Sequence, residues 1–228
     1  MEHVVLSREE SRAKREAHRR AKPPASLPLV YWPDDLESYT PTDHTREAYE
    51  RAASWWRGLP ERQALKDYVP VDREGYGQGL LLSGPYGTGK TTLAAAVLLS
   101  SWFNGRTKVM FVRFVDLLEA NRPQQSYIRP DGLEDVSDIE RAHDIVKGVR
   151  ETDLLLLDDV GRGKASEFAA GVIEDVIRGR YLAGKPTIIT SNLEPDEWKG
   201  RYGEGVADFL YQAFADIVYI GGPSLRGR

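Results

Sequence analysis

The stretch GPYGTGKTT, Gly84 to Thr92, decides the fold. It contains a full match to the pattern G-x-x-x-x-G-K-[ST]. The apolar run Gly79–Ser83 before it predicts a buried strand, and the apolar residues of Thr91–Trp102 after it predict a helix. A strand, a glycine-rich turn and a helix in this order are the context in which the pattern forms a phosphate-binding loop. The sequence therefore predicts a nucleotide site.

The residue types of this loop suit an anionic ligand. Its glycines let backbone N–H groups surround phosphate oxygens without obstruction by a Cβ atom. Lys90 is predicted to place its charge on the β and γ phosphates, and the Thr91 hydroxyl to ligate Mg²⁺. The predicted nucleotide contacts are Gly84, Pro85, Tyr86, Gly87, Thr88, Gly89, Lys90, Thr91 and Thr92.

An acidic pair follows another apolar run. Leu154–Leu157 predicts a buried strand, and Asp158 and Asp159 come directly after it. Ligands of parallel sheets bind beyond the carboxyl ends of the strands, so we expect this pair near the phosphate loop. Asp158 is predicted to hold Mg²⁺ through water, and Asp159 to polarise the attacking water.

A polar strand end supplies a further candidate. Thr187–Thr190 is predicted to be a strand, and Asn192 follows it after one residue. An amide there would orient the lytic water or contact the γ phosphate. The alternative, an asparagine that only begins the turn Leu193–Pro195, remains equally open.

The order of apolar runs and helical patterns predicts an α/β fold. The predicted strands have uniformly apolar rather than alternating sequences, which is typical of a parallel sheet covered by helices on both faces. The predicted strands are Gly79–Ser83, Lys108–Phe114, Asp153–Leu157, Thr187–Thr190 and Ile217–Ile220. Helices are predicted over Thr45–Trp56, over Thr91–Trp102, around Leu117, from Asp138 onward after a capping box Ser137…Glu140, and over Ser166–Ala183.

Composition excludes several classes of protein. The chain has 228 residues, 41% of them hydrophobic, which favours a single core domain. Its net charge of −4 argues against a uniformly basic surface that binds nucleic acid through phosphates alone. It has no cysteine, so disulfide scaffolds, thiolate metal sites and cysteine nucleophiles are excluded. No apolar stretch is long enough for a membrane span, and we expect a soluble, cytoplasmic protein without membrane contact.

Charge divides the beginning of the chain. Residues 1–30 carry seven Lys or Arg and four Asp or Glu, whereas residues 31–60 carry three and six. Prolines at 23, 24 and 28 would end any helix in the first segment. We expect residues 1–30 to be a basic arm, either solvated or partner-binding, and residues 31–228 to be the nucleotide-binding domain.

The motifs GPYGTGKTT, LLLLDDVG and KPTIITSNL, in that order, resemble the AAA+ ATPases of the DnaC/DnaI helicase-loader and IstB group. Leu36–Tyr39, Arg180-Tyr181 and the segment Gly222–Arg226 are also similar to that group. The resemblance covers residues 35–228 and implies a P-loop NTPase of five parallel strands, ATP and Mg²⁺ as ligands, and a lid domain that is absent or minimal. It also implies that Asn192 is the sensor-1 residue and that Arg226 is a sensor-2-like arginine reaching the nucleotide.

Two departures from the group affect turnover. Where members place an arginine finger that acts on a neighbouring subunit, this chain has Phe209, and Arg201 is the candidate substitute. Asp159 stands where many AAA+ proteins have glutamate, which moves the carboxylate about one methylene away from the water. Loss of a finger costs about 10³–10⁵ in rate, so we expect an ATPase that is slow or partner-stimulated.

The segment Asn121–Gly132 lies where initiator-type AAA+ proteins insert a DNA-contacting element. It contains Arg122, Tyr127 and Arg129, a mixture suited to phosphate pairing and base stacking on single-stranded DNA. An ordinary exposed loop is the equally open alternative.

The resemblance leads to one main functional hypothesis. It is an ATP-dependent replication factor that forms an ATP-dependent homo-oligomer and loads or recruits a DnaB-type replicative helicase on single-stranded DNA. The alternatives are an IstB-like transposition ATPase and an ATP-gated adaptor that does not hydrolyse ATP. A small-molecule kinase is less consistent, because no arginine-rich lid follows the predicted sheet.

Overall fold

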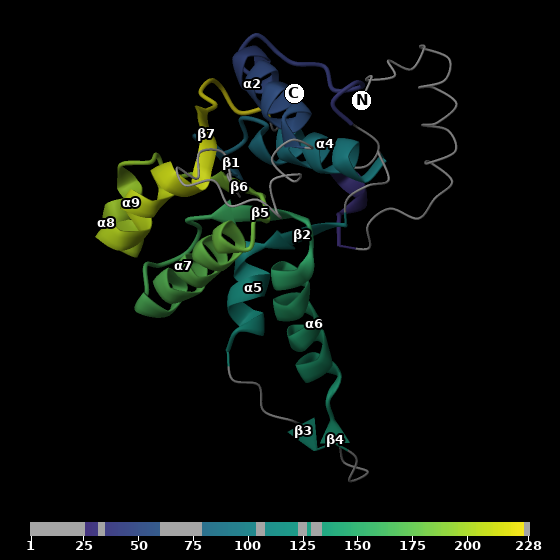
Figure 1. Cartoon of the computed structure of the whole chain (residues 1–228), viewed down its shortest axis with the longest axis vertical. Coiled ribbons are helices and arrows are strands. Elements are labelled where there is room, and N and C mark those ends of the chain that lie inside the picture. The colour runs from purple at the N-terminus through teal and green to yellow at the C-terminus, as the bar shows by residue number, and fades with distance from the viewer. Residues whose placement is uncertain are drawn as a thin grey trace.

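The computed structural model describes residues 26–31, 35–59, 79–103, 108–122, 127–128 and 134–225. A five-stranded parallel sheet with the order β2-β5-β6-β1-β7 forms its centre (Figure 1). The strands are β1 (Gly79–Ser83), β2 (Val109–Arg113), β5 (Leu154–Val160), β6 (Thr187–Ser191) and β7 (Phe214–Tyr219). The predicted α/β class and all five predicted strands are confirmed, with β5 extended to include both aspartates.

Helices cover both faces of the sheet. Among the elements described, α2, α4 and the short turn η1 pack on one face, and the other helices pack on the opposite face or beside it (Figure 1). The helices are α2 (Arg46–Arg57), α4 (Lys90–Phe103), α5 (Phe114–Ala120), α6 (Ser137–Glu151), α7 (Glu167–Leu182), α8 (Glu197–Tyr202) and α9 (Glu204–Ala213), with a short 3₁₀ turn η1 (Leu29–Tyr31).

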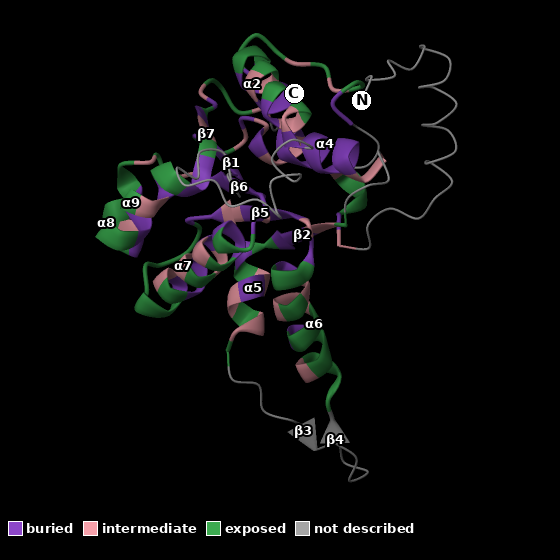
Figure 2. Cartoon of the chain, viewed as in Figure 1, coloured by how far each residue is buried: buried purple, intermediate pink, exposed green. Residues whose placement is uncertain are grey.

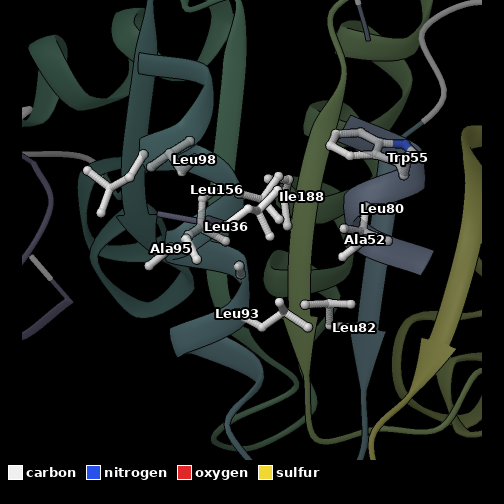
Figure 3. Packing of buried hydrophobic residues seen from close by; sticks show 14 of the residues in the cluster. Leu36, Ala52, Trp55, Leu80, Leu82, Leu93, Ala95, Leu98, Leu156 and Ile188 are labelled. Carbon is white, nitrogen blue, oxygen red and sulfur yellow. The ribbon is translucent and has the colours of Figure 1, made fainter. Parts of the chain in front are cut away.

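Strand β1 shows why uniformly apolar sequences suit this position. Leu80 and Leu82 join the cluster under α2 and α4, together with Trp55 and Leu93 (Figure 3). Leu81 points the other way, into the cluster under α7 and α9. Each fully buried leucine contributes about 1.5–3 kcal/mol relative to an exposed one. The central strands are accordingly buried along their length (Figure 2).

Helix α2 and the beginning of α6 differ in detail from the sequence prediction. Helix α2 begins and ends one residue later than predicted. Trp55 is fully buried, and Trp56 donates through Nε1 to Ser101 Oγ at 3.0 Å. Helix α6 begins at Ser137, one residue before the predicted start at Asp138, and Val136 precedes it as the N-cap residue.

A small hairpin begins within the segment Asn121–Gly132 and ends just beyond it. Strands β3 (Tyr127–Ile128) and β4 (Glu134–Asp135) pair antiparallel, in the register Tyr127↔Asp135 and Ile128↔Glu134. The hairpin lies at the end of α5 and α6 remote from the sheet (Figure 1).

Candidate nucleotide site

The carboxyl ends of β1, β5 and β6 form the edge of the sheet on which the predicted site residues meet. Strand β6 lies between the other two and pairs parallel with both. The phosphate loop therefore leaves the sheet beside Asp158, Asp159 and Asn192. Parallel pairing explains why motifs about 70 and 100 residues apart in the chain converge.

The loop between β1 and α4 has a backbone that requires glycine. Gly84, Gly87 and Gly89 have φ values of 136°, 82° and 92°. A Cβ atom at Gly84 would lie 2.3 Å from Ile220 O, and one at Gly87 would lie 2.2 Å from Ser224 Oγ. The N–H of Leu225 donates to Gly87 O at 2.8 Å, so the segment after β7 is bound to this loop.

Lys90, the first residue of α4, is buried against the loop. Its Nζ donates to Gly84 O at 2.8 Å and to Pro85 O at 2.6 Å. The amino end of α4 also carries the positive end of the helix dipole. Phosphate oxygens fit this arrangement because they would take over the bonds that the two carbonyls now accept.

The other loop residues fall into two groups. Thr88 is buried and donates through Oγ1 to Pro85 O at 3.0 Å, which closes the turn. Pro85 and Tyr86 are exposed, and Thr92 is half-buried.

Asp158 is the centre of a hydrogen-bond network. Its Oδ1 accepts from Thr91 Oγ1 at 2.8 Å and from Thr190 Oγ1 at 2.6 Å. Burial raises the pKa of Asp158 above the ordinary aspartate value, while the donating hydroxyls of Thr190 and Thr91 act in the opposite direction. Thr190 was not identified from the sequence, although its position at the polar end of a buried strand was a usable signal.

The oxygen donors of Thr91 and Asp158 suit Mg²⁺, a hard cation. Within the described ranges, no group of three or more His, Cys, Asp or Glu residues could hold a metal ion by itself. Mg²⁺ bound with a nucleotide needs only one or two protein oxygens, since phosphates and waters complete its coordination. The donor set therefore fits a metal that arrives with ATP.

Asp159 points away from its neighbour. The pairing of β5 with β6 shifts register between Leu157 and Val160, and Asp159 has a φ of 63°, which is uncommon for a residue other than glycine. Its N–H donates to Thr190 Oγ1 at 2.9 Å, and its Oδ2 accepts from Arg162 Nη1 at 3.1 Å. The bulge thus gives the two adjacent carboxylates different partners.

Asn192 faces the loop that follows β5. A Cβ atom at Gly161 would lie 3.1 Å from Asn192 Oδ1. This Oδ1 atom is buried and has no hydrogen-bond partner among the described residues. The turn after β6 is closed by Ser191, whose Oγ accepts from Leu193 N at 3.0 Å. A buried amide oxygen without a donor fits a water ligand, which can donate a hydrogen bond to it, better than a role in the turn.

Arg201 also lies near the carboxyl ends of the strands, where it binds residues of its own chain. Its Nη2 donates to Gly161 O at 2.9 Å and also to Gly163 O. Phe209 packs edge-on against Tyr181, with ring centroids 5.3 Å apart, and under the guanidinium of Arg178. The action of Arg201 on a neighbouring subunit stays a prediction.

The remaining predicted residues do not join the site. Arg122 is exposed just beyond α5, and the backbone of Tyr127 belongs to β3, far from the phosphate loop (Figure 1). Arg129, Arg226 and residues 1–25 lie outside the described residues.

The profile of the IstB-like ATP-binding proteins matches residues 41–228 of this chain. The chain belongs to that family. The predicted resemblance to the DnaC/DnaI and IstB group is thereby confirmed, and the family is one of ATP-binding proteins.

Individual relatives of this IstB-like chain divide between two kinds of protein. An ATP-binding protein in an insertion sequence of Mycobacterium tuberculosis is 29% identical over 169 residues, covering 72% of this chain and 62% of the relative. The replicative helicase loader DnaC of Escherichia coli is 24% identical over 148 residues, covering 65% and 56%. The chain thus matches only about three fifths of the length of these relatives.

A solved structure confirms the AAA+ fold of the IstB-like chain. The replication initiator DnaA bound to AMPPCP and single-stranded DNA superposes with a TM-score of 0.60 at 19% identity, covering 86% of this chain and 51% of that one. Among the described helices, none is both long and apolar enough to cross a membrane.

Proposed function

We propose that this protein is an ATP-hydrolysing switch that loads or recruits a ring-shaped replicative helicase on single-stranded DNA. The observation that carries the proposal is the network Thr91–Asp158–Thr190, with Asp159 and Asn192 beside it on one sheet edge. The network offers oxygen ligands for Mg²⁺. Asp159 offers a carboxylate that can accept a proton from water, and Asn192 offers an amide beside them. The similarity to DnaC supports the helicase as the partner.

The chemistry follows from the positions of these groups. Lys90 exchanges its bonds to Gly84 and Pro85 for bonds to the β and γ phosphates, and Thr91 and Asp158 would hold the metal. Mg²⁺, when bound, neutralises phosphate charge. Asp159 accepts a proton from water as the water oxygen bonds to the γ phosphorus and the bond from that phosphorus to the bridging oxygen breaks. Arg162 Nη1 already donates to Oδ2 of Asp159 at 3.1 Å and makes this carboxylate a weaker base, so we expect slow turnover by the isolated chain.

The DNA contact is assigned to the segment around the β3–β4 hairpin. The hairpin lies well away from the ATP site, so DNA and nucleotide would bind without competing for space (Figure 1). Arg122 supplies charge near its base, and Tyr127 and Arg129 supply a ring and a second charge in sequence. That DnaA has been solved with single-stranded DNA supports the same ligand here.

A transposition ATPase is the second candidate. The IstB-like profile and the insertion-sequence protein of Mycobacterium tuberculosis favour it directly. In this case the partner would be a transposase and the nucleic acid a duplex. An ATP-gated adaptor without hydrolysis has the same site but leaves Asp159 unused.

Partner capture separates these functions. The purified chain is mixed with a DnaB-type helicase or with a transposase, each with ATP, with ADP and without nucleotide, and ATP hydrolysis is measured with single-stranded and duplex DNA. ATP-dependent helicase binding with faster turnover on single strands supports the loader. Transposase binding without helicase binding overturns it in favour of the second candidate.

Asp159→Asn tests hydrolysis itself. General-base assistance contributes about 10²–10⁴ in rate, so turnover should fall by about that factor while ATP affinity is retained. Asp175→Asn, which changes an exposed carboxylate on α7, is the matched control and should leave both values unaltered. A normal rate in Asp159→Asn would show that another group activates the water.

A further inference from the structure

The loop that carries Asp159 is bound by a helix from later in the chain. We call residues 159–163 the Asp159 loop. Arg201, in α8, donates through Nη2 to the carbonyl oxygens of Gly161 and Gly163. The two carbonyls are on alternate residues, so one side chain binds the loop at two points.

The Asp159 loop has little regular structure of its own. Asp159, Gly161 and Gly163 have φ values of 63°, 101° and 96°, and the backbone bond from Arg162 N to Asp159 O is long, at 3.4 Å. Alternating left-handed residues do not form a continuous hydrogen-bond ladder. External bonds therefore contribute much of the order that this loop has.

Helix α8 provides a fixed base for Arg201. Trp198 is fully buried, and its ring centroid lies 5.2 Å from that of Tyr202. Tyr202 in turn meets Phe114 edge to face at 6.3 Å. Burial raises the pKa of Tyr202, as expected for a phenol enclosed beneath the Asp159 loop. A short helix held by two buried aromatic residues keeps the start of the Arg201 side chain in place.

The geometry points to Arg201 as a positioning residue for Asp159 in its own subunit, rather than as an arginine that reaches the nucleotide of a neighbour. Its Nη2 is already committed to two carbonyls of the loop that bears the catalytic carboxylate. Moving it to another subunit would leave both carbonyls without this donor, and among the described residues only the bonds to Thr190 and Ser191, at the strand end of the loop, would still hold it to β6. This inference rests on the proposed ATPase function.

The first test is kinetic and uses Arg201→Gln. A carboxylate displaced by about 1 Å can lose about 10²-fold in rate. We expect kcat to fall by about 10- to 100-fold with ATP affinity and Tm nearly unchanged. In an Asp159→Asn background the same substitution should cause no further loss, because Arg201 acts through Asp159. Arg178→Gln is the matched control: it removes an arginine that binds a carbonyl, Gly205 O, elsewhere. Additive losses, or a joint fall in Tm and affinity, would overturn the inference.

Subunit mixing tells the two roles of Arg201 apart. Lys90→Ala chains keep Arg201 but bind ATP about 100-fold more weakly, so at an ATP concentration near the wild-type Kd they stay largely empty, whereas Arg201→Gln chains keep the ATP site. A residue that acts on the neighbouring subunit would be supplied by the Lys90→Ala chains, so mixing would restore turnover. We expect no restoration, and any gain in rate above the sum of the separate chains contradicts the inference.

Amide hydrogen exchange tests the contact without requiring turnover. The amides of residues 160–163 should exchange faster in Arg201→Gln than in the wild type, because the loop opens more often. Unchanged exchange would overturn the inference. A wild-type chain without any turnover would overturn the proposed ATPase activity and the positioning role with it. Wild-type turnover that Arg201→Gln leaves intact would overturn the inference alone.

Discussion

Lys90 and Arg180 are both buried cations bound by backbone carbonyl groups, and they lie at opposite edges of the central sheet. At the carboxyl edge, Lys90 donates to Gly84 and Pro85 of one loop. At the amino edge, Arg180 joins the end of α6 to the starts of β5 and β6. It donates to Thr187 Oγ1 at 2.8 Å and to the carbonyls of Val149, Thr152, Pro186 and Asp153 at 2.7, 3.0, 2.9 and 3.4 Å.

Lys90 and Arg180 differ in whether a ligand can replace their hydrogen-bond acceptors. The carbonyls around Lys90 belong to a single turn that is partly open to solvent, and a phosphate offers stronger, charged acceptors in the same place. The acceptors around Arg180 come from three elements that are fixed in the core. Burial lowers the pKa of Arg180 to about 9, so the guanidinium remains charged at neutral pH. A buried cation bound by carbonyls can therefore exchange them for phosphate at the carboxyl edge, whereas at the amino edge it holds core elements together.

Arg180→Met should have the largest effect, which is a loss of stability. It removes all the bonds of the guanidinium while keeping an apolar stem, and each buried carbonyl left without a donor costs about 1–3 kcal/mol. We expect a loss of about 3 kcal/mol or more, which lowers Tm by about 10 °C. Denaturant unfolding measures it. Arg180→Lys keeps the charge but offers fewer donors, so its free energy of unfolding should lie between those of the wild type and Arg180→Met. If Arg180→Met unfolds like the wild type, the two edges do not differ as described.

Lys90→Ala should leave stability within about 1 kcal/mol and lower ATP affinity by about 100-fold, or about 3 kcal/mol. The reason is that water replaces the ammonium at the open loop, whereas no water can replace its charge on the phosphates. Titration with a fluorescent ATP analogue, beside denaturant unfolding, gives both numbers. A large loss of stability would mean that Lys90 is a structural cation like Arg180.

Thr190→Val should have the smallest effect and sharpen the picture of the carboxyl edge. It removes the hydrogen bond that the Thr190 hydroxyl donates to Asp158 and the acceptor for Asp159 N–H. We expect the free energy of unfolding to fall by about 1–2 kcal/mol. Without that donor the pKa of Asp158 rises further, because the charged form loses a hydrogen bond. Mg²⁺-dependent ATP binding should then fail at a higher pH, as acid protonates the carboxylate, than in the wild type. Identical pH profiles would remove Thr190 from the site.

For residues that belong to local motifs, the sequence was enough to predict their position in the fold. The phosphate loop, Asp158, Asp159 and Asn192 could be predicted because each lies at the end of an apolar strand, and parallel strands bring such ends together. The five strands could be predicted because sheets covered on both faces need uniformly apolar sequences.

Contacts between distant segments could not be predicted. Arg201 was identified as a charge, but its contact with Gly161 and Gly163 depends on the packing of α8, a six-residue helix too short for a periodic pattern. The divergence of Asp158 and Asp159 depends on a bulge that no local signal marks. The hairpin has only two residues in each strand, which is below the length at which alternation can be recognised.

The hydrogen bond between Leu225 and Gly87 has a practical consequence for following this protein in solution. The chain has no cysteine, so Ser224→Cys would create a unique thiol at an exposed position directly beside Gly87. A dye attached there would sit next to the phosphate loop. Its fluorescence would follow each binding and release of nucleotide in real time, in the same sample in which helicase or DNA is added.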